Sequence, residues 1–367
     1  MKSRTIQLLI AILVGGLALY LFSTQVENWD KVWASIMQAH WGYVGIAVVL
    51  QFVGMYIRAL RWKSFLGEPA VPSGKLFLFA NIGFMGNGVF PARMGELIRP
   101  FLIGRYTPHT FSTGLATIVV ERVFDLLGIL LILAYVLMVF PFPTFEGAES
   151  TMIGGVEVPA DPRAAIQGLA QLGLVTCIGL FIAVAIIVYF PDFSLRVART
   201  LLKPFPHKIR DMLLRALVSF EQGATTFRRP FSFLYCFVLT MLLWVVIAFS
   251  EWVVLWAFGI DEVTFLGALF LMAGLCFAVM LPQLPGYIGI YQWATALILV
   301  QTFAIDPDVS AAVAWVMWVS QVPPIIVGGF ICLLIAGVTF DEISHVSQEE
   351  SEPVDGETQE RSSPQST

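Results

Sequence analysis

Three ionised side chains stand in a short stretch, NGVFPARMGELIRP, which lies between two apolar segments. Arg93, Glu96 and Arg99 recur at intervals of three residues, so in a helix they share one side. An arginine fork matches the oxygens of a phosphate. Because charged side chains at membrane depth are costly, we favour a binding site here for a lipid phosphate or a similar anion, to which Asn87 also contributes. The alternative is a structural Glu–Arg network that pins this segment.

Two prolines frame the predicted helix. Pro91 suits the first helical turn, where its missing N–H is no loss. Pro100 is expected to end the helix at about Arg99, because the residue before a proline avoids the helical conformation. The free amides at the start of such a helix would add to the attraction for an anion.

A second charged group, VVERVFDLLG, lies inside a long apolar run. Glu121 and Asp125 face the same way on a helix, and Arg122 is three residues from Asp125. Two acids with one base leave a negative surplus that a cation elsewhere, or a proton, must neutralise. Arg93 or Arg99 is the expected partner. The group could be a structural network, a part of the binding site, or both.

A third segment, LPQLPGYIGIYQ, is interrupted by proline and glycine at membrane depth. Two broken segments, one in each half of a chain, are typical of a transporter binding site. We therefore place Pro285, Gly286, Gly289 and Gln292 in the candidate site. The pair Pro323–Pro324 is expected only to kink the last apolar helix.

Composition predicts the class. Apolar residues make up 57% of the 367 residues, charged residues only 13%, and the mean hydropathy is +0.80. This indicates an all-α polytopic membrane protein, and about eight runs are long enough to be transmembrane helices. Scattered cysteines and histidines give no metal site, no cofactor is expected, and no basic surface predicts nucleic-acid binding. The runs are residues 6–22, 41–57, 111–140, 168–190, 231–258, 265–281, 288–303 and 309–338.

The distribution of lysine and arginine predicts a cytoplasmic N-terminus in the plasma (inner) membrane. Residues 28–40 should lie outside as an interfacial helix. Residues 191–230 should lie inside, as an amphipathic helix on the membrane surface or as an ordinary loop. Residues 76–90 are apolar but short and contain several glycines. A full crossing there would put residues 141–167, which have a single basic residue, in the cytoplasm, so we expect a re-entrant hairpin instead. A second hairpin remains open around Pro285.

The membrane domain is expected to span residues 1–340. In residues 341–367 eight acidic residues face a single arginine, and almost nothing there is apolar. We therefore expect an acidic disordered tail. Whether this tail lies inside or outside depends on whether residues 288–303 cross the membrane.

The order of these motifs resembles the lysylphosphatidylglycerol synthase transmembrane-region family. The resemblance covers residues 6–338, and it implies an all-helical domain similar to the flippase half of lysyl-lipid resistance factors. Only the acidic tail follows the last span, so lipid aminoacylation is not expected, and Gln292 stands where the family often has an acid. The motifs are Arg58-x-x-Arg61-Trp62, Asn87 to Arg99, Glu121-Arg122-x-x-Asp125 and Pro285-Gly286-x-x-Gly289.

These observations predict a flippase-like transporter that binds an anionic phospholipid or a lipid-linked substrate and moves it across the membrane. We expect no enzyme activity, because no catalytic set is recognisable. The alternatives are a membrane-embedded enzyme or accessory subunit acting on a lipid carrier in envelope biosynthesis, and a scaffold that recruits partners through its tail. Membrane lipids are the expected partners, and a homo-oligomer is left open.

Overall fold

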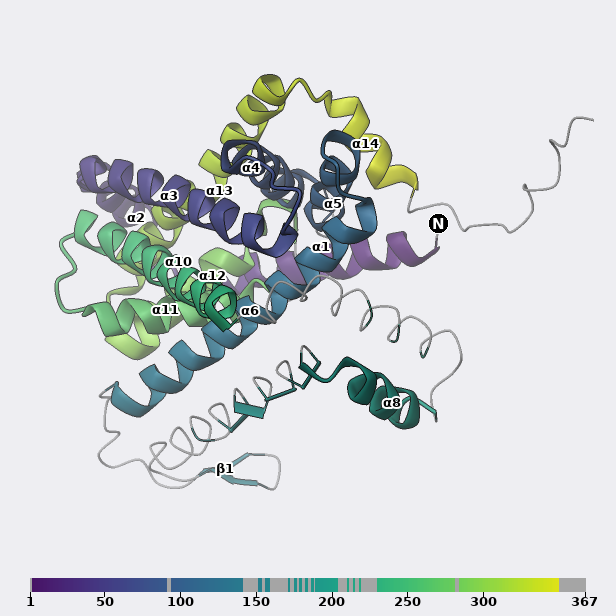
Figure 1. Cartoon of the computed structure of the whole chain (residues 1–367). Coiled ribbons are helices and arrows are strands. Elements are labelled where there is room, and N and C mark those ends of the chain that lie inside the picture. The colour runs from purple at the N-terminus through teal and green to yellow at the C-terminus, as the bar shows by residue number, and fades with distance from the viewer. Residues whose placement is uncertain are drawn as a thin grey trace, which may run out of the picture.

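The computed structural model is a bundle of long helices (Figure 1), and it describes residues 2–90, 94–140, 151–153, 156–158, 189–203, 230–280 and 284–349, with scattered positions between 171 and 218. Two short antiparallel strands, β1 (Thr151–Ile153) and β2 (Val156–Val158), pair with Thr151 opposite Val158. The helices are α1 (Lys2–Gln25), α2 (Trp29–Gln38), α3 (Trp41–Leu66), α4 (Ser73–Val89), α5 (Gly95–Tyr106), α6 (Phe111–Val139), α8 (Pro191–Leu201), α10 (Pro230–Ala257), α11 (Phe265–Ala278), the short 3-10 helix η3 (Pro285–Tyr287), α12 (Ile290–Phe303), α13 (Pro307–Ala336) and α14 (Phe340–Glu349).

Four described helices are long and apolar enough to cross a membrane: Trp41–Leu66, Phe111–Val139, Phe231–Ala257 and Pro307–Ala336. The all-helical membrane class is thus supported, but the expected count of about eight spans is not confirmed. Two of the predicted spans, α11 and α12, have only 14 residues each. At about 1.5 Å per residue each is roughly 21 Å long, short of the roughly 30 Å of a bilayer core. The predicted span 168–190 lies mostly outside the described residues.

One end of the bundle is marked by α2. The α2 N-terminus is capped by Asn28, and its tryptophans Trp29 and Trp33 are exposed, as expected of an interfacial helix. The backbone N–H of His40 donates to the carbonyl of Ala257 (2.8 Å), so the start of α3 and the end of α10 lie at the same end. Lys31 pairs with Asp306 at 2.6 Å, which puts the start of α13 there too. We call this the α2 end.

The opposite end is formed by the base of the α4–α5 hairpin and by α14. Lys75 donates to the carbonyl of Tyr106 (2.5 Å), which closes the hairpin base, and the Tyr106 hydroxyl donates to Glu342 (2.9 Å). The Tyr106 hydroxyl also lowers the pKa of the Glu342 carboxyl. The chain after α13 therefore emerges at the end opposite α2. We call this the α14 end.

The expected disordered tail differs from the structure over its first residues. Residues 341–349 belong to α14, and Ile343 is fully buried against the core. One apolar side chain that packs, together with the Tyr106–Glu342 hydrogen bond, is enough to dock this helix where composition predicted disorder. Residues 350–367 lie outside the described residues.

Only part of the predicted amphipathic segment 191–230 can be compared. Its first eleven residues form α8, in which Phe193, Val197 and Leu201 are exposed together with Arg196 and Arg199. This is the pattern of a helix that lies on a membrane surface. Residues 204–209 and 219–229 lie outside the described residues.

Two helical hairpins enter the bundle from opposite ends, and their tips meet. The α4–α5 hairpin has its base at the α14 end. The α11–α12 hairpin has its base at the α2 end, since Gly267, near the start of α11, packs against Phe303, the last residue of α12. The tips touch where Gly286 approaches the backbone of Gly88. Such opposed, broken elements are the arrangement found at substrate sites of membrane transporters.

The prediction that Pro100 ends its helix is wrong. Helix α5 runs from Gly95 to Tyr106 with the buried Pro100 inside it. Helix α6 packs closely on this proline, because Gly114 has no side chain and sits against the Pro100 backbone. Membrane helices tolerate internal proline where neighbouring helices compensate for the lost hydrogen bond. Pro91, expected in the first turn, lies outside the described residues, and Pro323 and Pro324 also lie within a continuous helix, α13.

Replacing Asp308 with alanine is expected to lower the free energy of unfolding by about 2–4 kcal/mol, since a buried charged acceptor is lost. The Asp308 carboxylate is 2% exposed and accepts the backbone N–H groups of Glu27 (2.8 Å) and Asn28 (3.0 Å). These bonds tie the α1–α2 connection to α13. Thermal unfolding in detergent should show the loss, while Asp261→Ala, an exposed aspartate at the same end, should change little. Equal effects of the two variants would contradict this role for Asp308.

Candidate functional site

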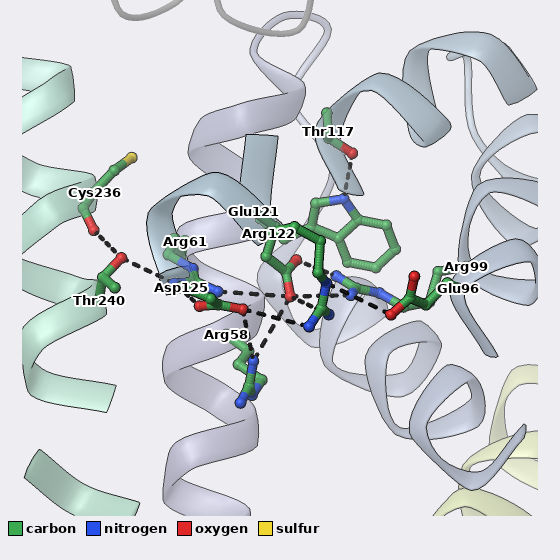
Figure 2. Close-up of polar contacts among 11 residues, drawn as sticks. Arg58, Arg61, Glu96, Arg99, Thr117, Glu121, Arg122, Asp125, Cys236 and Thr240 are labelled. Carbon is green, nitrogen blue, oxygen red and sulfur yellow. Dashed lines mark hydrogen bonds and ion pairs between the residues drawn. The ribbon is translucent and has the colours of Figure 1, made fainter. Parts of the chain in front are cut away.

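Buried charges from α3, α5 and α6 form one network in the middle of the bundle (Figure 2). Its centre is Glu121, which is fully buried. Arg99 donates to both of its carboxylate oxygens, at 3.1 and 2.7 Å, in the bidentate geometry that arginine favours. This contact confirms the expectation that Arg93 or Arg99 would meet the acids of α6.

Arg61 forms the second strong contact of the network. Its guanidinium lies 2.7 Å from the Asp125 carboxylate and also donates to the Thr240 hydroxyl at 2.9 Å. Thr240 in turn donates to the carbonyl of Cys236, so α10 is linked to the network (Figure 2). Because Arg61 is fully buried, these contacts are what make its charge tolerable at this depth.

An aromatic side chain holds Arg99 in place. The Arg99 guanidinium carbon lies 4.2 Å from the centre of the Trp62 ring, within the range of a cation–π interaction. The Trp62 N–H donates to the Thr117 hydroxyl at 2.8 Å, which fixes the orientation of the ring. Two neighbours in α3 thus support the two acids of α6: Arg61 pairs with Asp125, and Trp62 positions the Arg99 that binds Glu121.

Arg58 and Arg122 are held much less tightly. Arg58 lies 3.7 Å from Glu121 and 3.6 Å from Asp125, and the Nη1 atom that makes both approaches has no hydrogen bond to any described residue. Arg122 lies 3.5 to 3.7 Å from Glu96, Glu121 and Asp125, and 41% of its side chain is exposed. Across the network four arginines face three carboxylates, so one positive charge is left over.

Arg58 and Arg122 line a cavity of about 410 Å³, a size typical of ligand pockets. Helices α3, α4, α6, α10, α11 and α13 contribute most of its walls, which are largely apolar, and both hairpin tips reach it. The polar or charged residues of the lining are Gln51, Arg58, Asn87, Glu96, Arg122, Asp125, Trp244, Glu251, Tyr287, Tyr291 and Gln321.

The residues proposed from the sequence fall into three places. Asn87, Glu96, Arg122 and Asp125 line the cavity. Arg99 and Glu121 lie behind them as the core of the network, and Glu96 pairs with Arg122 rather than with Arg99. Arg93 lies outside the described residues.

The late motif mainly shapes the second hairpin. Gln292 is fully buried and accepts the backbone N–H of Gly289 at 2.8 Å, so it caps its own helix. Gly289 has a positive φ of 92° and packs on the α1 backbone, where a side chain would not fit. The carbonyl of Gly286, next to Pro285, accepts the Trp318 N–H at 2.7 Å. Of the described residues in this motif, Tyr287 and Tyr291 line the cavity.

Sequence reasoning about the site missed Arg58, Arg61, Glu251 and Tyr291. Arg58 and Arg61 were interpreted as cations after the second span and as part of a family motif, although three-residue spacing at the end of an apolar run places both on one helix face. Glu251 had a clear signal, a single carboxyl in a long apolar helix, which marks a functional position by default. Among the described residues no group of three acid, histidine or cysteine side chains could hold a metal ion.

The comparison with protein families now bears on this geometry. Residues 7–328 match the family described as the lysylphosphatidylglycerol synthase TM region. The chain belongs to this family. The match covers the network, the cavity and both hairpins. No solved structure is detectably similar to the chain.

Three relatives are similar over most of the chain. "Glycosyltransferase AglD" of Haloferax volcanii is 26% identical over 96% of this chain, which spans 59% of the length of that protein. Two proteins of Methanothermobacter thermautotrophicus, each named "UPF0104 membrane protein", are 25% and 23% identical. They cover 74% and 86% of this chain, which spans 78% and 90% of their lengths.

These relatives correct one expectation. The sequence was expected to have no enzyme activity because no catalytic set was recognisable in it. A relative that matches 96% of the chain carries the name of a glycosyltransferase, so the lack of a familiar catalytic motif does not exclude enzymatic function in this lineage.

Proposed function

We propose that the chain is a membrane-embedded enzyme or accessory subunit that binds a lipid carrier phosphate for the processing of a lipid-linked sugar. One observation carries this proposal. Two arginines of a network with net positive charge line a mostly apolar cavity, and neither has a carboxylate of the described residues closer than 3.5 Å. The apolar walls suit a hydrocarbon chain, and the loose arginines suit a phosphate.

The geometry supports a division of labour within the network. Arg99 and Arg61 each hold a carboxylate oxygen at 2.7 Å and would remain in place when a ligand binds. Arg58 and Arg122 keep guanidinium N–H groups that the carboxylates, at 3.5 Å or more, do not satisfy. A phosphate placed between these two arginines would accept hydrogen bonds from both and balance the surplus charge.

The similarity to a protein named glycosyltransferase supports the choice of a lipid-linked sugar over a bulk phospholipid. We place the α14 end of the molecule in the cytoplasm, on the lysine and arginine distribution of the sequence, and the α2 end outside.

The first test is the affinity of the purified chain for a polyprenyl phosphate. Arg122→Gln should weaken binding at least about tenfold, since a charge-assisted hydrogen bond is lost. Arg105→Gln is the matched control, because Arg105 is an exposed arginine of the same hairpin, away from the cavity. Equal affinities in both variants would contradict a phosphate site at Arg122. Sugar transfer to or from the same carrier should then be assayed in membranes.

Translocation of the same lipid is a second candidate, favoured by the two hairpins that enter from opposite ends and meet at the cavity. Liposomes that contain the chain and a fluorescent polyprenyl phosphate would separate the two functions. Quenching of the inner-leaflet probe by an external reagent would support movement across the bilayer. Sugar transfer without such quenching would favour the enzymatic function alone.

A further inference from the structure

Three further polar side chains, those of Trp244, Glu251 and Tyr291, line the cavity. Glu251 on α10 is 4% exposed, and its Oε2 atom has no hydrogen-bond partner among the described residues. Within that same part of the chain, the hydroxyl of Tyr291 and the N–H of Trp244 also lack hydrogen-bond partners, with exposures of 7% and 6%. Leaving such buried groups unpaired is expensive, so three of them around one cavity indicate a surface suited to a polar ligand.

The positions of Trp244 and Glu251 along α10 set their distances from Arg58. The Arg58 guanidinium carbon lies 6.0 Å from the centre of the Trp244 ring. Glu251 follows Trp244 by seven residues, two helical turns or about 10 Å along α10. Gln51 lies two turns from Arg58 on α3 in the same direction, and its side chain reaches the Gln321 carbonyl at 3.5 Å. The cavity therefore has a cationic part and, farther toward the α2 end, a neutral and acidic part.

The chemistry of the second part selects a class of ligand. Glu251 presents an oxygen that accepts, Trp244 presents an N–H that only donates, and the Tyr291 hydroxyl can do either. A sugar hydroxyl both donates and accepts, so a set of hydroxyls can satisfy all three. An ammonium group has no acceptor and would leave the Trp244 N–H unpaired.

We propose that the part of the cavity between Trp244, beside Arg58, and Glu251 holds the hydroxyl groups of a sugar that is attached to the lipid phosphate. This inference rests on the proposed phosphate site at Arg58 and Arg122 and extends it with a sugar site. Glu251 accepts from one hydroxyl, the Trp244 N–H donates to another, and Tyr291 completes the set. The ligand is thus a hexosyl polyprenyl phosphate rather than the bare carrier.

The test compares two probes on the purified full chain, a polyprenyl phosphate and the same lipid with a hexose on its phosphate. The wild type should bind the hexosyl lipid at least about tenfold more tightly. Glu251→Met, which keeps the length of the side chain and removes the oxygens, should bring the two affinities to within about twofold. Tyr291→Phe should reduce the preference by about threefold, and it removes only the hydroxyl.

Each remaining result has a defined meaning. If the bare phosphate binds in an Arg122-dependent way but the hexose adds no affinity, the sugar site is overturned while the phosphate site stands. If neither lipid binds in an Arg122-dependent way, the proposed function itself fails. A gain for an aminated lipid that Glu251→Met abolishes, with none for the hexosyl lipid, would overturn the hydroxyl assignment. Equal affinity for a water-soluble hexose 1-phosphate would overturn the lipid as its source.

Discussion

Replacing Glu121 with glutamine is expected to destabilise the protein more than any other single charge change in the network. Glu121 is fully buried and accepts both hydrogen bonds of Arg99, while Arg58, Arg61 and Arg122 lie within 3.7 Å of it. Removing its charge leaves buried arginines without compensation, which typically costs about 3–5 kcal/mol. The expected result is a large fall in the thermal midpoint in detergent and poor recovery of folded protein.

Glu96→Gln is the matched control for this prediction. Glu96 belongs to the same network, but its side chain is 34% exposed and its one contact with Arg122 is 3.7 Å long. An exposed pair of this kind contributes about 0–1 kcal/mol. A double variant, Arg99→Gln with Glu121→Gln, should be more stable than Glu121→Gln alone, because it also removes the orphaned charge. Similar stability of Glu121→Gln and Glu96→Gln would show that the network does not hold the helices together.

Gly95→Ala is expected to separate the two helices of the first hairpin. A methyl group on Gly95 would collide with the backbone carbonyl of Gly83 and come within 2.6 Å of the Asn87 amide oxygen. The first obstacle is backbone and cannot rotate away, so α5 must move from α4. Overpacking costs up to about 3 kcal/mol. Because α5 carries Glu96 and Arg99, and α4 carries Asn87, the same shift should also disturb the cavity.

Gly74→Ala serves as the control, since a methyl group at this position in α4 meets nothing within 4 Å. Thermal unfolding and binding of polyprenyl phosphate should both be measured. The account predicts that Gly95→Ala loses stability and affinity while Gly74→Ala retains both. A stable Gly95→Ala variant with normal affinity would show that close approach of α4 and α5 is not required.

Local sequence patterns were sufficient where the structure depends on neighbours along the chain. The spacing of Glu121 and Asp125 and their surplus charge predicted a meeting with an arginine of the preceding segment, and Arg99 makes that contact. The shortness of the apolar run 76–90, together with the charge distribution, predicted a hairpin at this segment, where α4 forms the first arm and α5 the second. The capped, tryptophan-rich helix α2 was also predicted from its own residues.

The sequence did not predict features that depend on which segments meet in space. Arg61 pairs with Asp125 from 64 positions away, and its spacing from Arg58 predicts a shared helix face but not which acid that face meets. Pro100 remains within a helix because Gly114 of α6 packs on it, which overrides the local rule for proline. The apolar runs 265–281 and 288–303 predicted two full membrane spans, whereas the helices that they form, α11 and α12, have only 14 residues each.

The central claim is that the cavity beside Arg58 and Arg122 holds a lipid phosphate, and the lipids that remain bound after purification test it most directly. Native mass spectrometry of the wild type, Arg122→Gln and Arg105→Gln would identify these lipids. The account predicts a polyprenyl phosphate or its hexosyl derivative, enriched over the membrane pool in the wild type and in Arg105→Gln, and lost in Arg122→Gln. The same bulk phospholipids in all three proteins would contradict it.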